Sequence, residues 1–65
     1  MNLSNFYTIY LDGKTVIHFD NLLIAKLKAY EMHLIDNLNY TVKGNNTKKI
    51  TIQDLKNYFD NFKNN

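Results

Sequence analysis

The sequence predicts an α+β fold: a small ββα-ββα domain, with a mostly antiparallel four-stranded sheet and two helices packed on one face. Three observations predict it. Two strand-like runs flank Asp12-Gly13, a helical periodicity follows over residues 22–38, and a weaker strand, turn, strand and helix pattern comes after it. The length of 65 residues fits one small domain covering residues 1–65, with residues 1–4 and 63–65 expected to fray.

The strongest local signal is a hairpin near the start of the chain. Residues 6–11 and 15–19 are rich in aromatic and β-branched side chains, and Asp12-Gly13 between them favours a two-residue type I′ turn. Regular pairing through that turn joins Leu11 with Lys14, Ile9 with Val16, and Tyr7 with His18. Both faces of such a hairpin are apolar, whereas a hairpin with one face in solvent needs only one apolar face. We therefore expect either a bulge that changes the register or a second layer that covers the outer face.

A long helix is expected over residues 22–38, after the N-cap candidates Asp20 and Asn21. One stripe of large apolar residues has helical spacing and is predicted to pack on the sheet: Leu23, Leu27, Tyr30 and Leu34. The other side of the helix carries charged residues and a narrow stripe formed by Ala25, Ala29 and Met32. That stripe is a candidate partner contact, or it reflects only the high helix propensity of alanine.

The second half of the chain shows a similar pattern less clearly. Residues 40–43 and 48–52 alternate like strands on either side of turn residues 44–47, and a second helix is expected over residues 53–62. Thr51-Ile52-Gln53-Asp54 resembles a capping box with Asp in place of Glu. This half therefore predicts a second hairpin and the second helix.

The two halves also align with each other, Tyr7-Thr8-Ile9 with Tyr40-Thr41-Val42, at an offset of 33 residues. A true duplication and a coincidence of biased composition are both open. A duplication would make eight residues equivalent inward positions: Tyr7, Ile9, Ile17, Phe19, Tyr40, Val42, Ile50 and Ile52. This conflicts with a regular two-residue turn, under which Ile9 and Ile17 point to opposite faces.

The composition suggests an origin and a location. Eight basic residues, all of them Lys, stand against six acidic ones, for a formal net charge of +2. Asn, Lys and Ile are abundant and Arg, Pro and Trp are absent, as in proteins from A/T-rich genes of low-GC bacteria and of their phages or plasmids. The chain has no long apolar run, no signal-peptide pattern and no Cys, so we expect a cytoplasmic protein of a bacterial host with no membrane contact.

Patterns that carry catalysis or metal binding are missing from the sequence. The hydroxyl nucleophiles are Ser4 and five Thr, and no Cys is present. His18 and His33 have no further ligand at a metal-binding spacing, and both Gly residues fit turns better than a phosphate-binding loop. We therefore expect no enzyme activity, no catalytic residue, no metal ion and no cofactor.

Two classes of function remain, and protein binding is favoured. The nine aromatic residues, five Tyr and four Phe, exceed what so small a core needs, and both residue types are frequent interface anchors. The predicted partner-binding residues are Phe6, Tyr10, Ala25, Ala29 and Met32. The expected partners are a larger host protein and, in a homodimer, a second copy. We expect a small phage- or plasmid-encoded inhibitor of a host bacterial enzyme or defence complex, and an anti-CRISPR-like role falls within this expectation.

The alternative is a small nucleic-acid-binding or regulatory protein that uses lysines near the second turn. Its candidate residues are Lys43, Lys48 and Lys49, with Tyr side chains to stack on bases. The chain lacks Arg, the usual reader of guanine, and its net charge is low. These two features favour the protein-binding class.

Overall fold

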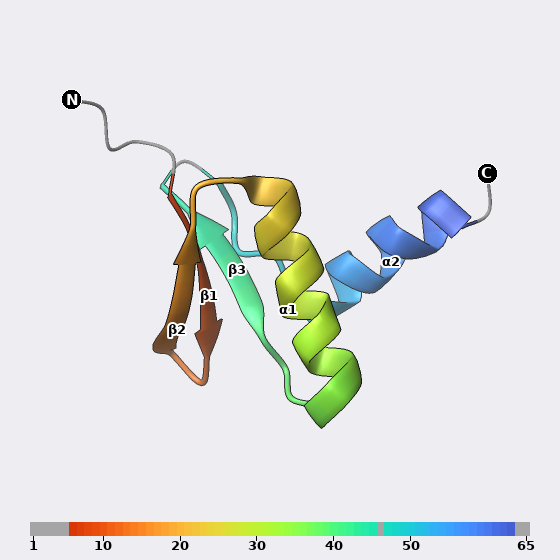
Figure 1. The fold of residues 1–65 in the computed structure, drawn as a ribbon, viewed down its shortest axis with the longest axis horizontal. Coiled ribbons are helices and arrows are strands. Elements are labelled where there is room, and N and C mark those ends of the chain that lie inside the picture. Colours follow the sequence, from red (N-terminus) through yellow and green to blue (C-terminus); the bar gives the residue numbers. More distant parts are fainter. Residues whose placement is uncertain (1–5, 46, 64–65) are drawn as a thin grey trace.

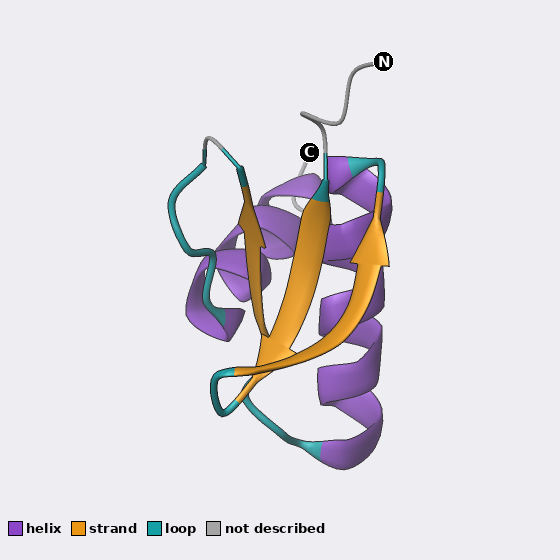
Figure 2. Ribbon diagram, turned by 90° about the vertical axis from the view of Figure 1, so that its left-hand side faces the viewer, coloured by secondary structure: helices purple, strands orange, loops and turns teal. Residues whose placement is uncertain are grey.

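The computed structural model describes residues 6–45 and 47–63, which form an α+β fold with two helices and a three-stranded antiparallel sheet. The elements follow in the order β1 (Tyr7–Leu11), β2 (Lys14–Phe19), α1 (Leu22–Asp36), β3 (Thr41–Gly44) and α2 (Ile52–Lys63). The strand order is β2-β1-β3, so the first strand is central (Figure 1). Both helices lie behind the sheet in Figure 2, which leaves its front face uncovered by them. The predicted class is confirmed.

The turn between β1 and β2 is the predicted one. Asp12 and Gly13 have positive φ angles of 53° and 79°, as a type I′ turn requires of both central residues. Leu11 and Lys14 pair on either side of them. Asp at the first position tolerates the left-handed conformation, and Gly at the second adopts it without steric cost.

A bulge in β2 then changes the register. Tyr10 pairs with Thr15, whereas Ile9 pairs with Ile17, so Val16 is an extra residue without a partner in β1. The regular pairs predicted for Ile9 with Val16 and for Tyr7 with His18 are therefore wrong, and the bulge named as the alternative is present. It also removes the conflict over register, because Ile9 and Ile17 now lie on the same face of the sheet.

The predicted fourth strand is not seen in residues 6–45 and 47–63. Ile50 forms an isolated bridge with Val42, with backbone N to O distances of 2.9 and 2.8 Å, but no other described residue extends this pairing into a ladder. The reason is the early start of α2. The backbone N–H of Thr51 donates to Oδ2 of Asp54 at 3.0 Å, and the N–H of Asp54 donates to Oγ1 of Thr51 at 3.3 Å. This reciprocal capping box turns the chain into a helix directly after Ile50.

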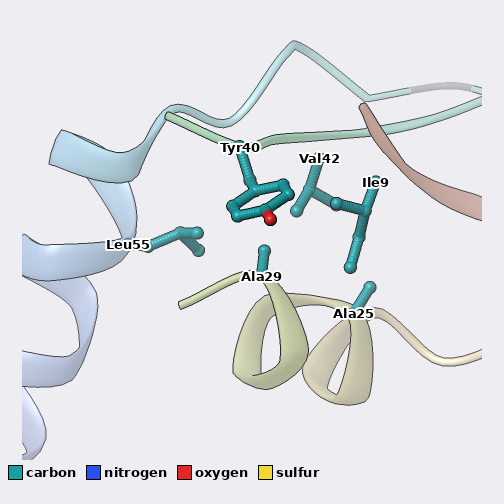
Figure 3. Close-up of a cluster of buried hydrophobic side chains, with 6 residues drawn as sticks. All are labelled: Ile9, Ala25, Ala29, Tyr40, Val42 and Leu55. Carbon is teal, nitrogen blue, oxygen red and sulfur yellow. The ribbon is translucent and has the colours of Figure 1, made fainter. Parts of the chain in front are cut away.

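The core forms where the helices meet the sheet. Its buried residues are Ile9, Ala25, Ala29, Tyr40, Val42 and Leu55. Figure 3 shows Ile9 and Val42 pointing toward the two alanines, with the Tyr40 ring between Leu55 and Val42 and above Ala29. Small side chains on the inward side of α1 let the helix backbone approach the strands closely.

The inward side of α1 is therefore the opposite of the predicted one. Ala25 and Ala29 are fully buried, and Met32 packs against the core. In contrast, Leu27 is 48% exposed and Leu34 is 68% exposed. Leu27 lies about 160° around the helix from both alanines, since successive residues are about 100° apart. The leucine stripe predicted to face the sheet thus faces away from it, apart from Tyr30, which packs against the core.

Both ends of α1 follow local side-chain chemistry. The Oδ1 of Asn21 accepts a hydrogen bond of 3.1 Å from the backbone N–H of Ile24, so Asn21 is the N-cap of the two candidates. Asn37 adopts a left-handed φ of 64° and ends the helix at Asp36, two residues before the predicted end. Of the predicted tails, residues 1–4 and 64–65 lie outside the described residues, and Lys63 is the last residue of α2.

Candidate interaction surfaces

The side of the sheet that faces away from the helices forms a surface that we call the outer sheet face. Side chains alternate along a strand, so the residues between the inward Tyr7, Ile9 and Leu11 point outward, together with their cross-strand partners. This face consists of Phe6, Thr8, Tyr10, Thr15, His18, Thr41 and Lys43. It contains no Asp or Glu. Its two basic side chains are His18 and Lys43, and neither of them can carry a negative charge.

The centre of the outer sheet face is a packed group of side chains. Oγ1 of Thr8 and Nδ1 of His18 form a hydrogen bond of 2.8 Å, and the Phe6 ring lies 5.7 Å from the His18 ring, between centroids. Thr8 is only 7% exposed although it lies on the uncovered side. Its hydroxyl is bonded to His18, and the His18 ring in turn contacts the Phe6 ring, so these three side chains form one contiguous group.

The structure brings two of the five predicted partner-binding residues together on this face. Phe6 is 44% exposed and Tyr10 is half-buried. Ala25 and Ala29 lie on the opposite side of the sheet and have no exposed surface, so neither can contact a partner in this fold. Met32 is half-buried against the same core. The alanine stripe is a core feature, and it is separate from the aromatic pair.

The three lysines of the alternative prediction lie in different settings. Lys43 belongs to the outer sheet face, opposite Thr8 in the β1–β3 register, and its Nζ donates long hydrogen bonds of 3.4 Å to the carbonyl oxygens of Gly44 and Thr47. Lys48 and Lys49 are exposed in the segment between β3 and α2. The ammonium group of Lys43 is thus partly engaged by the adjoining turn.

A second surface, which the sequence interpretation missed, lies on α1. We call it the α1 outer face, and it consists of Leu23, Ile24, Leu27, Lys28, Glu31, Leu34 and Ile35. All five of its aliphatic side chains are exposed, Ile35 the most at 80%. Nζ of Lys28 and Oε1 of Glu31 form an exposed ion pair of 3.2 Å between them. The sequence could have predicted this exposed apolar face, because large aliphatic residues occupy more of the helix surface than one sheet can cover.

Part of the aromatic surplus is used between the two helices. The rings of Tyr30 and Phe59 stack with centroids 5.2 Å apart, and Tyr58 meets Phe59 edge to face at 5.0 Å. Nζ of Lys26 lies 3.9 Å from the centroid of the Tyr58 ring. These contacts fix α2 against α1, so Tyr30 and Tyr58 have a structural role and only part of the aromatic set is left for a partner.

Asp36 and Tyr40 form a structural pair near the end of α1, and each shifts the pKa of the other. The hydrogen bond from the Tyr40 hydroxyl, followed by the backbone N–H of Leu38, lowers the pKa of Asp36. The same Asp36 contact, together with burial, raises the pKa of Tyr40. Both shifts favour a carboxylate that accepts and a phenol that donates, so neither group is prepared for proton transfer at neutral pH.

Residues 6–45 and 47–63 contain no cluster of three or more His, Cys, Asp or Glu side chains that could hold a metal ion. Over the same ranges, neither helix has the length and apolar character needed to cross a membrane.

In comparisons with known protein families, with curated proteins and with solved structures, the chain matches none of them.

Proposed function

We propose that this protein is a non-enzymatic binding module whose outer sheet face docks on a larger protein and blocks a surface of that protein. The observation that carries the proposal is the arrangement of Phe6, Tyr10 and His18 on a sheet face that neither helix covers. Aromatic side chains are enriched in the centres of protein interfaces, because they bury a large area with few rotatable bonds.

The charges on this face define the partner. Lys43 lies beside Thr8 on this face, and no carboxylate is present on the three strands. A complementary surface therefore has an apolar pocket for an aromatic ring and acidic side chains around it. We propose a host bacterial enzyme or defence complex with such a surface as the target, and a phage or plasmid as the source of this inhibitor.

Two variants, compared with the wild type, test the docking surface. Affinity capture from a low-GC bacterial lysate is carried out before and after nuclease treatment, using the wild type, Tyr10→Ala and Phe62→Ala. Phe62 is the matched control, because it is an exposed aromatic residue on α2 and is not part of the outer sheet face. The captured protein is then titrated with each variant. Tyr10→Ala should weaken binding by about 5- to 150-fold, whereas Phe62→Ala should not.

The same experiment distinguishes the alternative function. If nucleic acid is the partner, capture disappears on nuclease treatment, and affinity falls steeply between about 50 and 200 mM salt. A Lys48→Ala/Lys49→Ala variant then loses binding while Tyr10→Ala retains it. That combination of results would overturn the proposed docking function.

A further inference from the structure

We propose that two copies of this chain associate through the α1 outer face, with their α1 helices antiparallel about a two-fold axis. This surface is distinct from the outer sheet face, so the association goes beyond the proposed docking function. The α1 outer face points away from the sheet, because the alanines that contact the strands are on the opposite side of the helix. A pair formed in this way leaves both outer sheet faces free.

The first argument is the amount of apolar surface left exposed. Five large aliphatic side chains are exposed on this one helix, whereas only three large side chains of the described residues, Ile9, Val42 and Leu55, are fully buried. A small domain with so little core commonly needs oligomerisation for stability. Apolar residues lie on both the inward and the outward side of α1, and an apolar stripe on a helix normally faces another layer of the structure.

The second argument is that the apolar pattern of α1 is symmetric about its midpoint, Ala29. Leu23 and Ile24 precede Ala29 by six and five residues, and Leu34 and Ile35 follow it by five and six. A two-fold interface requires such a pattern, because each surface must complement itself.

Helix geometry then assigns the contacts in an antiparallel pair. Leu23 and Leu34 are 11 residues apart, as are Ile24 and Ile35, and a step of 11 residues returns to within about 20° of the same direction around a helix. Each of these two rows therefore has an apolar residue at both ends. Antiparallel pairing places Leu23 against Leu34 of the second copy, and Ile24 against Ile35 of the second copy.

The third argument is the charge at the centre of the face, and it selects the orientation. Lys28 and Glu31 lie on either side of the midpoint of α1 and form an ion pair within one chain. In an antiparallel dimer, Lys28 lies beside Glu31 of the second copy, so opposite charges meet twice. In a parallel dimer, Glu31 lies near Glu31 of the second copy, and like charges meet. Charge complementarity thus favours the antiparallel arrangement.

Sedimentation equilibrium of the intact chain tests the association. The wild type should sediment as two copies of 7.7 kDa and dissociate on dilution. Ile35→Ser should weaken the dimer by about tenfold or more, because it removes an aliphatic side chain from each copy. Ile35 is 80% exposed in the monomer, so this change should leave the fold intact. Val16→Ser removes a similarly exposed aliphatic side chain from β2 and should not change the dimer. A wild type that stays monomeric at millimolar concentration would overturn the proposal.

Charge reversal tests the orientation. Glu31→Lys places Lys28 beside a second cation and should weaken an antiparallel dimer, and the double change Lys28→Glu/Glu31→Lys should restore it. In a parallel dimer, Glu31→Lys only replaces a contact between two carboxylates with a contact between two ammonium groups. An unchanged dimer affinity would therefore contradict the antiparallel arrangement.

Cross-linking gives an independent readout, because the chain has no cysteine. When Leu23→Cys and Leu34→Cys proteins are mixed and oxidised, the mixed disulfide should form faster than either homodimeric disulfide. Faster formation of the two homodimeric products would overturn the antiparallel pairing. This result does not depend on a host target, so the dimer and the docking function can fail separately.

Discussion

The phenolic hydroxyl of Tyr40 donates a hydrogen bond of 2.5 Å to Oδ2 of Asp36, across the loop that joins α1 to β3. Oδ1 of the same carboxylate accepts a bond of 3.0 Å from the backbone N–H of Leu38. The Tyr40 ring is in the core, whereas Asp36 is exposed at the end of the helix. This contact therefore fixes the last turn of α1 to the start of β3.

The Asp36–Tyr40 contact predicts two pH windows for stability. The pKa of Asp36 is lowered in the fold, so its stabilising contribution is present above about pH 4 and is lost as the pH falls through the lowered native pKa. The pKa of Tyr40 is raised, so its contribution is present below about pH 10 and is lost as the pH rises through the raised pKa. Denaturant unfolding across both ranges should show these losses, and Tyr40→Phe should reduce both. An unchanged pH profile in Tyr40→Phe would contradict the assignment.

Gly44 is predicted to tolerate no side chain. A Cβ at this position would lie 2.7 Å from Cδ1 and Cε1 of the Tyr7 ring, its partner across the β1–β3 ladder. Gly44→Ala should therefore destabilise the fold by about 1–3 kcal/mol through overpacking, measured by thermal or denaturant unfolding. The cost should be smaller in a Tyr7→Leu background, where the ring is absent. Equal costs in the two backgrounds would show that the ring is not the cause.

The inward side of α1 can be tested by two opposite changes in size. Ala29→Leu adds volume to a fully buried position and should cost about 1–3 kcal/mol. Leu27→Ala removes a half-exposed side chain and should cost less than about 1 kcal/mol in the monomer. Both are best measured in an Ile35→Ser background, so that dimer formation does not contribute. A larger loss of stability for Leu27→Ala than for Ala29→Leu would indicate instead that the leucine stripe faces the sheet.

Deletion of Val16 should leave the fold intact, because Val16 is the extra residue of the bulge and has no partner in β1. Without it, Thr15 still pairs with Tyr10 and Ile17 still pairs with Ile9, now in a regular ladder. Deletion of Thr8 is the matched control, since it moves Tyr7 to the outer face and should unfold the protein. Nuclear Overhauser contacts between Ile9 and Ile17 should persist in the first variant, and their loss there would disprove the assigned bulge.

Features that depend on local chemistry could be predicted from the sequence. The Asp12-Gly13 turn, the Asn21 N-cap and the Thr51 capping box each depend on side chains within a few residues of the backbone groups that they satisfy. The uncovered positions of Phe6 and Tyr10 could also be anticipated from the alternation along the first strand.

Features that depend on competition between distant segments could not be predicted in this way. Large apolar residues lie around most of α1, so periodicity identifies a helix but leaves its inward direction open; close approach to the sheet then favoured Ala25 and Ala29 over the leucines. Residues 48–52 could serve as a strand or as the start of a helix. The capping box at Thr51 ended the extended conformation after a single bridge at Ile50.

The position of β1 in the sheet has a consequence for synthesis on the ribosome. This strand is the first to emerge and also the central one, so both of its edges need partners from later in the chain. β2 follows within a few residues, but β3 ends 33 residues after Leu11, which takes about 2–7 s at usual translation rates. During that interval the second edge of β1 has free N–H and C=O groups, and neighbouring nascent chains offer strands of the same sequence. The order of the strands thus creates a brief period of aggregation risk, which ends when Thr41–Gly44 reaches the sheet.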